Sequence, residues 1–386
     1  MRLVVFGHND WWTWEGQGFS TRNAALIREL AGRDEVGQIS IVDSPRFRGR
    51  THRPVERRHE DTSPVAARVT AVRYGYSLPL PSTWRYGRRL NEKLAHGTLL
   101  RRLATASSES EVTVLWVADP RLVAAAVSVP HDVFVFDAID DWRHHPWAGY
   151  AAVRHGYEIA AHRAGVVFAV HPRLLDVLRP TGYSEVLFNA VDSAPWATAR
   201  PSSEFAGASR PLVGYVGMIQ QRVDALLLAT VARRLPHATF VLVGQVSSGC
   251  RRLMTILPPN VRLLGHRPYH QVPALVAAWD ACIVPHRRDG LTDTMDPLKL
   301  YEYLASGKPV VSTVTSPNPV IASHVRVATM PDAFAAALAE EVELDDGERR
   351  AARRKAVHGQ TWAARASRAL HVIEEASRAI DSEVTW

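Results

Sequence analysis

Short runs of β-branched and aliphatic residues alternate with stretches of helical periodicity along the chain. Before residue 190, seven such runs predict strands, at Leu3–Phe6, Ile39–Val42, Val69–Arg73, Val112–Val117, Val133–Asp137, Val166–Val170 and Glu185–Phe188. Between them, segments such as Ser20–Leu30 and Tyr86–Leu103 place apolar residues at helical spacing. This alternation is typical of parallel sheets that are covered by helices.

The alternation starts again after a break in composition. A stretch rich in proline, serine and alanine ends at Arg210-Pro211 and is typical of a linker. Five later runs predict strands, at Leu212–Val216, Thr239–Val243, Val261–Leu264, Ala281–Pro285 and Val310–Ser312. We therefore predict an α/β fold with two Rossmann-like domains, 1–190 and 211–360, and a linker over 191–210. A charged helical pattern covers Gly347–Ala379, and 361–386 is expected to form a C-terminal helix, with packing back on the N-terminal domain as an option.

Composition restricts the class of protein. The 386 residues exceed the size at which one hydrophobic core stops growing, and 46% apolar with 22% charged residues is ordinary for a globular protein. No apolar stretch approaches the ~20 residues that a membrane-spanning helix needs, and no secretion signal is visible. Two cysteines, Cys250 and Cys282, are too few for a disulfide framework. We expect a cytoplasmic protein, with the inner membrane face as an option.

The net charge of +7 favours anionic partners, which include a phosphate-bearing substrate, an acidic membrane surface and nucleic acid. Six arginines lie in the polar stretch Arg46–Arg58, between two predicted strands. We interpret this stretch as a solvated loop, with contact to a membrane surface or an acidic acceptor as the alternative.

The strongest candidate site lies between residues 286 and 310. Proline suits the first turn of a helix, so Pro297 predicts a helix that runs to about Ser306 with Asp296 as its N-cap. Gly307 is expected to end this helix in the left-handed conformation.

Lys299 and Glu302 share one face of this predicted helix. A lysine in the first turn opposes the helix dipole, which favours a bound anion such as a diphosphate at that position. Glu302 is then placed to accept hydrogen bonds from ribose hydroxyls. The alternative is an i,i+3 surface ion pair without a ligand.

The run Asp296-Pro-Leu-Lys-Leu-Tyr-Glu-Tyr-Leu-Ala-Ser-Gly-Lys-Pro-Val-Val311 resembles the donor-site signature of the group 1 family of retaining glycosyltransferases. Arg210–Gly217 and Phe240–Gly244 resemble the first two C-domain strands of that family, and Asn189–Asp192 resembles its interdomain turn. The resemblance implies the GT-B fold, in which two Rossmann-like domains face each other across a cleft. It implies a hexosyltransferase type of enzyme in natural-product or cell-envelope glycosylation.

The resemblance also implies the ligands. A UDP-, dTDP- or GDP-linked sugar would be the co-substrate, held mainly by the C-terminal domain, and a small molecule or glycan would be the acceptor, held by the N-terminal domain. No other cofactor and no metal site are expected. The implied donor-binding residues are Gly217, Arg222, Asp293, Thr294, Pro297, Leu298, Lys299 and Glu302.

Two positions depart from the family's pattern. Thr294 stands where the family has its first acidic residue, and the basic pair after Gly217 is reduced to Arg222 in Gln220-Gln221-Arg222. Asp289, Asp293 and the backbone of 290–293 are the alternatives for holding the donor-sugar hydroxyls.

The segment His8–Arg22 follows the first predicted strand and is expected to be a flexible loop that faces the donor phosphates and the acceptor. Gly16 and Gly18 permit close approach of the backbone. Thr21 replaces the third glycine of a dinucleotide fingerprint, which argues against NAD. Indole rings can stack on sugar faces or anchor the loop, and the candidates are Trp11, Trp12 and Trp14.

Acidic and histidine side chains gather in Asp137–His145, after another predicted strand. Asp140 or Asp141 is a candidate to orient or deprotonate the acceptor hydroxyl, and His144 and His145 are candidates for proton transfer. The alternative is a structural role in capping this loop.

Two other functions remain open. An epimerase or a phosphorylase could use the same fold on a sugar nucleotide or a glycan. A non-catalytic nucleotide- or nucleic-acid-binding protein would use the basic charge. Phe47 alone among Phe, Tyr and Trp residues is interleaved with the arginines, so we expect no specific nucleic acid partner. Nothing in the sequence indicates the oligomeric state.

Overall fold

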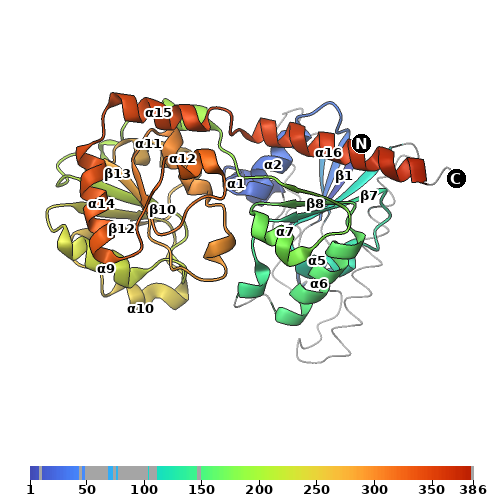
Figure 1. Cartoon of the computed structure of the whole chain (residues 1–386), viewed down its shortest axis with the longest axis horizontal. Coiled ribbons are helices and arrows are strands. Elements are labelled where there is room, and N and C mark those ends of the chain that lie inside the picture. Colours follow the sequence, from blue (N-terminus) through green and yellow to red (C-terminus); the bar gives the residue numbers. More distant parts are fainter. Residues whose placement is uncertain are drawn as a thin grey trace. The chain divides into compact units, whose positions relative to one another are not determined.

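The computed structural model describes residues 1–7, 11–42, 46–47, 68–72, 75–76, 103, 111–145 and 149–383. The chain forms two compact units (Figure 1). The first unit contains Met1–Ala169, Leu174–Val186 and Ala366–Trp386, and the second contains Val170–Arg173 and Leu187–Arg365. Apart from Leu103 and the backbone of 46–47, the predicted helix Tyr86–Leu103 and the arginine-rich stretch lie outside the described residues.

The first unit is built on a parallel sheet with the strand order β4-β2-β1-β6-β7-β8-β9. Its strands are β1 (Arg2–Phe6), β2 (Gln38–Val42), β4 (Val69–Val72), β6 (Thr113–Val117), β7 (Val133–Ala138), β8 (Val166–Ala169) and β9 (Tyr183–Val186). Helices α1 (Trp11–Gly16), α2 (Arg22–Ala31), α5 (Pro120–Ala126), α6 (Tyr150–Arg163) and α7 (Pro172–Leu178) connect them. Strands β3 (Arg46–Phe47) and β5 (Gly75–Tyr76) form a separate pair.

The second unit has a parallel sheet with the order β12-β11-β10-β13-β14-β15. Its strands are β10 (Leu212–Val216), β11 (Thr239–Val243), β12 (Val261–Gly265), β13 (Ala281–Val284), β14 (Val310–Ser312) and β15 (Arg326–Val327). Its helices are α8 (Ser193–Ala197), α9 (Ala225–Arg234), α10 (Arg251–Met254), α11 (Val272–Ala277), α12 (Leu298–Ala305), α13 (Pro319–Ala322), α14 (Pro331–Glu343) and α15 (Gly347–Val357).

Alternate residues of β11 divide between two hydrophobic cores, one on each face of this sheet. Val241 and Val243 pack in the core that includes residues of α11 and α12. Phe240 and Leu242 pack in the core that includes residues of α9 and α14. Because both faces are buried, the strand reads as a continuous apolar run, which is how the sequence predicted it.

The segment 191–210, predicted as a linker, clusters with the second unit instead of standing between two domains. It contains α8 and a short 3-10 turn, Ser203–Phe205. Trp196 and Phe205 are buried in the core of the second unit, and these two aromatic side chains explain why the segment is folded onto it.

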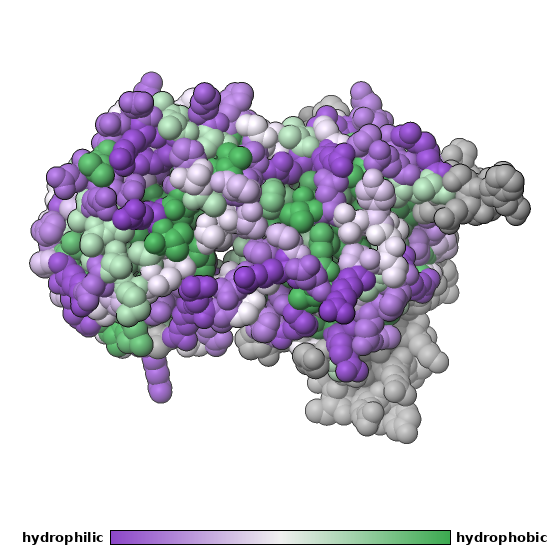
Figure 2. Space-filling model, in the orientation of Figure 1, coloured by the Kyte–Doolittle hydropathy of each residue, from purple (hydrophilic) through white to green (hydrophobic). Residues whose placement is uncertain are grey.

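The helical region predicted over Gly347–Ala379 consists of two helices, α15 and α16 (Trp362–Glu383). From Ala366 onward the chain belongs to the first unit, where Arg368 pairs with Glu185 at 2.6 Å. None of the described helices is long and apolar enough to cross a membrane. Figure 2 shows polar residues dominating the face in view of each unit, with apolar side chains exposed in small patches.

Candidate active site

The start of α12 differs from its prediction. Pro297 is the N-cap residue and lies outside the helix, and Asp296 does not cap it. The buried Asp296 carboxylate instead accepts hydrogen bonds from the Tyr301 hydroxyl (2.7 Å), the Ser316 hydroxyl (2.5 Å) and the Asn189 amide (2.7 Å). Through these three hydrogen bonds the carboxylate fixes the entry to α12 and ties the turn at residue 189 to it.

The end of α12 is as predicted. Gly307 has a φ of 77°, which is the left-handed conformation that glycine adopts most easily. Arg353 donates to the Gly307 carbonyl and Arg354 to the Ser306 carbonyl, both at 3.2 Å. Two guanidinium groups from α15 therefore compensate the negative end of the helix that carries Lys299.

Lys299 lies against a glycine and an aromatic ring. Its ammonium is 5.3 Å from the centroid of the Tyr215 ring, a cation–π contact. A Cβ atom added at Gly217, where φ is 139°, would lie 3.3 Å from both Cε and Nζ of Lys299. The glycine after β10 therefore leaves room for the lysine.

The electrostatics around Lys299 favour an anion. Burial, followed by the neighbouring charge of Arg222, lowers the pKa of Lys299 from 10.5 to about 8, while Glu302 acts in the opposite direction. Two cations are therefore held close together, and burial reduces the solvation that would stabilise them. A diphosphate in this place would relieve the repulsion.

Arg222 is fixed by contacts between two loops that follow neighbouring strands. Val223 forms an antiparallel bridge with His286, and the Arg287 amide donates to the Arg222 carbonyl at 2.7 Å. With its amide oriented to suit both groups, Gln220 accepts from the Arg222 guanidinium at 2.7 Å. The structure thus brings together the two basic residues that the sequence singled out.

His286 is a residue of this site that our sequence analysis missed. It follows β13, is 1% exposed, and places Nε2 3.4 Å from the Tyr215 hydroxyl. Its Nδ1 has no hydrogen-bond partner among the described residues. Burial, then Lys299 and Arg222, lower the pKa of His286 well below 6.5, so the ring is neutral. Its place at the end of a strand was the only signal in the sequence.

Glu302 is 8% exposed, so it is not one half of a surface ion pair. Burial raises the pKa of Glu302, whereas a hydrogen bond from Tyr269 and the charge of Lys299 lower it. The Tyr269 hydroxyl donates to Oε1 at 2.7 Å. Tyr269 follows β12 and was also missed by the sequence analysis, because 33 residues separate it from Glu302.

The loop before α12 leaves one carboxylate with room for a ligand. The Thr294 hydroxyl donates to the Leu291 carbonyl at 3.0 Å, and the Asp289 carboxylate accepts from the amides of Leu291 and Thr292. Asp293 is about one-third exposed, and its contact with Arg288 is long, at 3.5 Å. Among the three polar candidates on this loop, Asp293 is therefore the most available to a sugar hydroxyl.

In the first unit, the segment expected to be a flexible loop contains the helix α1. Trp11 and Trp14 are buried, at 4% and 2% exposure, which favours the anchoring alternative for these two rings over stacking on a sugar. These rings anchor the segment, as hydrophobic side chains do when a core is within reach. Gly16 and Gly18 are exposed, and Gly18 has a φ of 66°.

Asp141 caps the 3-10 turn Trp142–His144 and is 1% exposed. It accepts from the amide and the guanidinium of Arg143 and lies 3.6 Å from His144 Nε2. Asp140 lies 3.6 Å from His145 Nε2. This geometry favours the structural alternative for Asp141 and leaves Asp140 and the half-exposed His144 as candidates for proton transfer.

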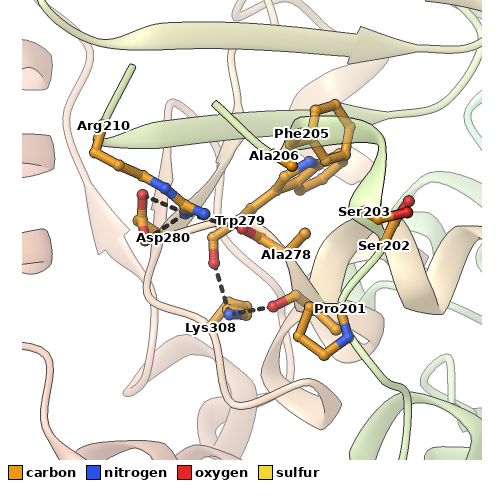
Figure 3. Close-up of a pocket in the computed structure, with 11 residues that line it drawn as sticks. Pro201, Ser202, Ser203, Phe205, Ala206, Arg210, Ala278, Trp279, Asp280 and Lys308 are labelled. Atoms are coloured by element: carbon orange, nitrogen blue, oxygen red, sulfur yellow. Dashed lines mark hydrogen bonds and ion pairs between the residues drawn. The ribbon is translucent and has the colours of Figure 1, made fainter. Parts of the chain in front are cut away.

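A cavity of about 300 Å³ lies elsewhere in the second unit (Figure 3). Arg210 pairs with Asp280 at 2.9 Å, and the Lys308 ammonium donates to the carbonyls of Ala277 (2.9 Å) and Trp279 (2.6 Å). Since both cations already have acceptors, this cavity offers less to a diphosphate than the Lys299 site does.

Comparison with known proteins agrees with the geometry of the second unit. Residues 210–343 match the sequence profile of the family described as glycosyl transferases group 1. The chain is 24% identical over 332 residues to TuaH of Bacillus subtilis, whose name attributes to it a glycosyltransferase role in teichuronic acid biosynthesis; the match covers 78% of each chain.

Solved structures share the fold over almost the whole chain. The sucrose-phosphate synthase of Thermosynechococcus elongatus has a TM-score of 0.71 at 14% identity, with 98% of this chain and 100% of that chain covered. The Anabaena protein HepE, in complex with UDP and glucose, has a TM-score of 0.62 at 15% identity, with 99% and 100% covered. The chain is therefore a glycosyltransferase with the GT-B fold, which transfers a sugar from a nucleotide sugar and whose residues 210–343 match the group 1 family.

Proposed function

We propose that Lys299 and Arg222 bind the diphosphate of the donor, and that Glu302 binds its ribose. The observation that carries this proposal is the partly buried Lys299 ammonium, which lies near a second cation, Arg222, and whose positive charge is balanced only in part by Glu302. Leu298 and Lys299 supply the first N–H groups of α12, because Pro297 has none, and N–H groups in this position favour anions.

Asp293 is our candidate for the donor-sugar hydroxyls. Its carboxylate has the weakest protein contact on the loop, whereas the Thr294 hydroxyl is committed to a backbone carbonyl. Asp293 would then take over the role of the acidic residue that the family has one position later, where this chain has Thr294.

In the reaction, the acceptor oxygen forms a bond to the anomeric carbon as the bond from that carbon to the diphosphate breaks. The diphosphate leaves with the electron pair, and Lys299, Arg222 and the start of α12 stabilise its charge. The hydroxyl proton passes to a base, for which Asp140 and His144 are our candidates. We take the transfer to be retaining, so that the acceptor oxygen bonds to the anomeric carbon on the face from which the diphosphate leaves, and NMR of the anomeric proton in the product tests that assignment.

A cell-envelope glycan is the acceptor class that we favour. TuaH is named for teichuronic acid biosynthesis, and the net charge of +7 suits an acidic acceptor. On this proposal the enzyme works in the cytoplasm, at the inner membrane face.

The test is nucleotide binding by the parent protein and by Lys299→Gln, Arg222→Gln and Glu302→Gln. UDP, GDP, ADP and dTDP are screened by thermal shift, and the best ligand is titrated by calorimetry. Each substitution is expected to weaken binding about ten-fold or more, as loss of one charge-assisted contact does. Binding as tight as that of the parent in all three variants would refute the assignment.

A further inference from the structure

We propose that Tyr269 is a positioning residue that holds the Glu302 carboxylate for the ribose of the donor, and that Trp196 holds Tyr269 in turn. This inference rests on the proposed role of Glu302. Neither residue has a place in the donor-site signature, and both come from parts of the sequence that lie far from it.

One hydrogen bond sets the orientation of the carboxylate. The Tyr269 hydroxyl donates to Oε1 of Glu302 at 2.7 Å. No described residue donates a hydrogen bond to Oε2, which is therefore left for the ligand. A ribose carries two vicinal hydroxyls, both donors, and an ionised carboxylate is an acceptor at both oxygens. The hydrogen bond to Oε1 fixes the orientation of the carboxylate, so that Oε2 points to the ribose and can still accept its hydrogen bonds.

The phenol itself is held by an aromatic contact. Tyr269 lies in the 3-10 turn Tyr269–Gln271, and its ring meets that of Trp196 edge-on, with centroids 6.1 Å apart and an interplanar angle of 67°. Trp196 belongs to α8, is 2% exposed, and packs in the core that includes α12. Two segments, at 196 and 269, therefore support the carboxylate that Glu302 carries on α12.

The hydrogen bond from Tyr269 also favours the ionised form of Glu302, which is the form that accepts hydrogen bonds at both oxygens. Burial raises the pKa of Glu302 and so favours its protonated state, while the hydrogen bond from Tyr269 opposes this. Burial and the charge of Glu302 raise the pKa of Tyr269, so the phenol stays protonated and remains a donor. Removal of the hydroxyl should weaken the contact to ribose and leave the contact to the diphosphate unchanged.

The experiment compares each protein's affinity for a ribonucleotide and for the same nucleotide without its diol. The probe is whichever of UDP, GDP and ADP gives the largest thermal shift with the parent, together with its 2′,3′-dideoxy form, both titrated by calorimetry. We expect the parent to prefer the ribonucleotide by about ten-fold or more, and Tyr269→Phe to reduce that preference to about two-fold. The dideoxy nucleotide should bind both proteins equally well.

Tyr301→Phe is the matched control, because it removes a buried phenol hydroxyl from α12 that bonds to Asp296 and not to Glu302. It should keep the parent's preference. Trp196→Phe replaces the indole with a smaller ring and so reduces the edge-on contact with Tyr269. This variant should give an intermediate preference, and it serves as the test if Tyr269→Phe does not fold.

The outcomes separate this inference from the proposed function. If Tyr269→Phe weakens both nucleotides by the same factor, or keeps the parent's preference, the positioning role is refuted while the donor site stands. If dTDP alone binds the parent, this inference is refuted while the diphosphate site stands, because the sugar of dTDP lacks the vicinal diol. If none of UDP, GDP, ADP and dTDP binds the parent, the proposed function fails, and this inference fails with it.

Discussion

Replacement of Lys299 by methionine should make the free protein more stable and the nucleotide complex weaker. The Lys299 side chain is partly buried, and this desolvation, followed by the charge of Arg222, lowers its pKa from 10.5 to about 8. The pKa difference corresponds to a penalty on the order of 3 kcal/mol for the charged lysine in the folded state. Loss of the cation–π contact with Tyr215 offsets ~1 kcal/mol of the gain.

The expected net effect of Lys299→Met is a rise of ~2 kcal/mol in the free energy of unfolding at pH 7, or ~4–8 °C in Tm for a unit of this size. Calorimetry and urea unfolding of the full chain measure it. The gain should also depend on pH. Below about pH 8, Lys299 is charged in the folded state, and the parent carries the full penalty for its charge. Between about pH 8 and 10.5 the unfolded state binds more protons than the folded state, so the parent's free energy of unfolding rises with pH. The difference in free energy of unfolding between the two proteins therefore shrinks over this range.

Lys308→Met is the matched control. Burial also lowers the pKa of Lys308, but its ammonium donates to the carbonyls of Ala277 and Trp279, so its removal should destabilise the protein. With saturating nucleotide the stability advantage of Lys299→Met should shrink by about 1.4 kcal/mol for each ten-fold loss of affinity, because the ligand stabilises the parent more than the variant. A Lys299→Met protein that is less stable than the parent at pH 7, or that keeps the parent's affinity, would refute the reasoning.

Three further outcomes are expected. Nucleoside diphosphate affinity should fall as pH rises through about 8, by up to about ten-fold per pH unit, because free Lys299 loses its proton; a flat calorimetric profile from pH 6.5 to 9.5 would contradict this. Gly217→Ala should weaken the same binding about ten-fold or more, because the new Cβ meets Lys299 at 3.3 Å, whereas Gly207→Ala, also at a positive φ but with nothing within 4 Å, should not change it. Asp141→Ala should destabilise the protein in urea unfolding by ~1–2 kcal/mol through loss of a cap, while His144→Ala should lower kcat without a comparable loss of stability.

Most strands of both sheets could be predicted from the sequence, and the buried ones were the clearest because buried parallel strands are continuous apolar runs. β10, β11 and β14 have the predicted bounds, whereas β9 ends two residues before the predicted strand does. β15 was missed, since Arg326 and Val327 are exposed and form no apolar run. These differences follow from burial, which is what the pattern of apolar residues reports.

Errors in the site arose where a distant partner competed for a side chain. Asp296 has the residue type of an N-cap and the right spacing, but Asn189, 107 residues away, donates to its carboxylate. Trp14 is of a residue type that can stack on sugars, but its indole ring is buried in the first unit. In each case local propensity was overridden by a tertiary contact that no spacing reveals.

The contrast between Lys299 and Tyr269 explains which site residues a single sequence can reveal. Lys299 was recognised because its place is locally unfavourable: a cation in the first turn opposes the helix dipole, so only something outside the helix can account for it. Tyr269 is favourable where it stands, and its partner is 33 residues away, so nothing local marks it. Residues that bind a ligand at the expense of the fold therefore appear in the sequence as departures from local helix and strand preferences. The residues that position them satisfy those preferences, and they are recognised only when the folded strands bring their loops to one edge of the sheet.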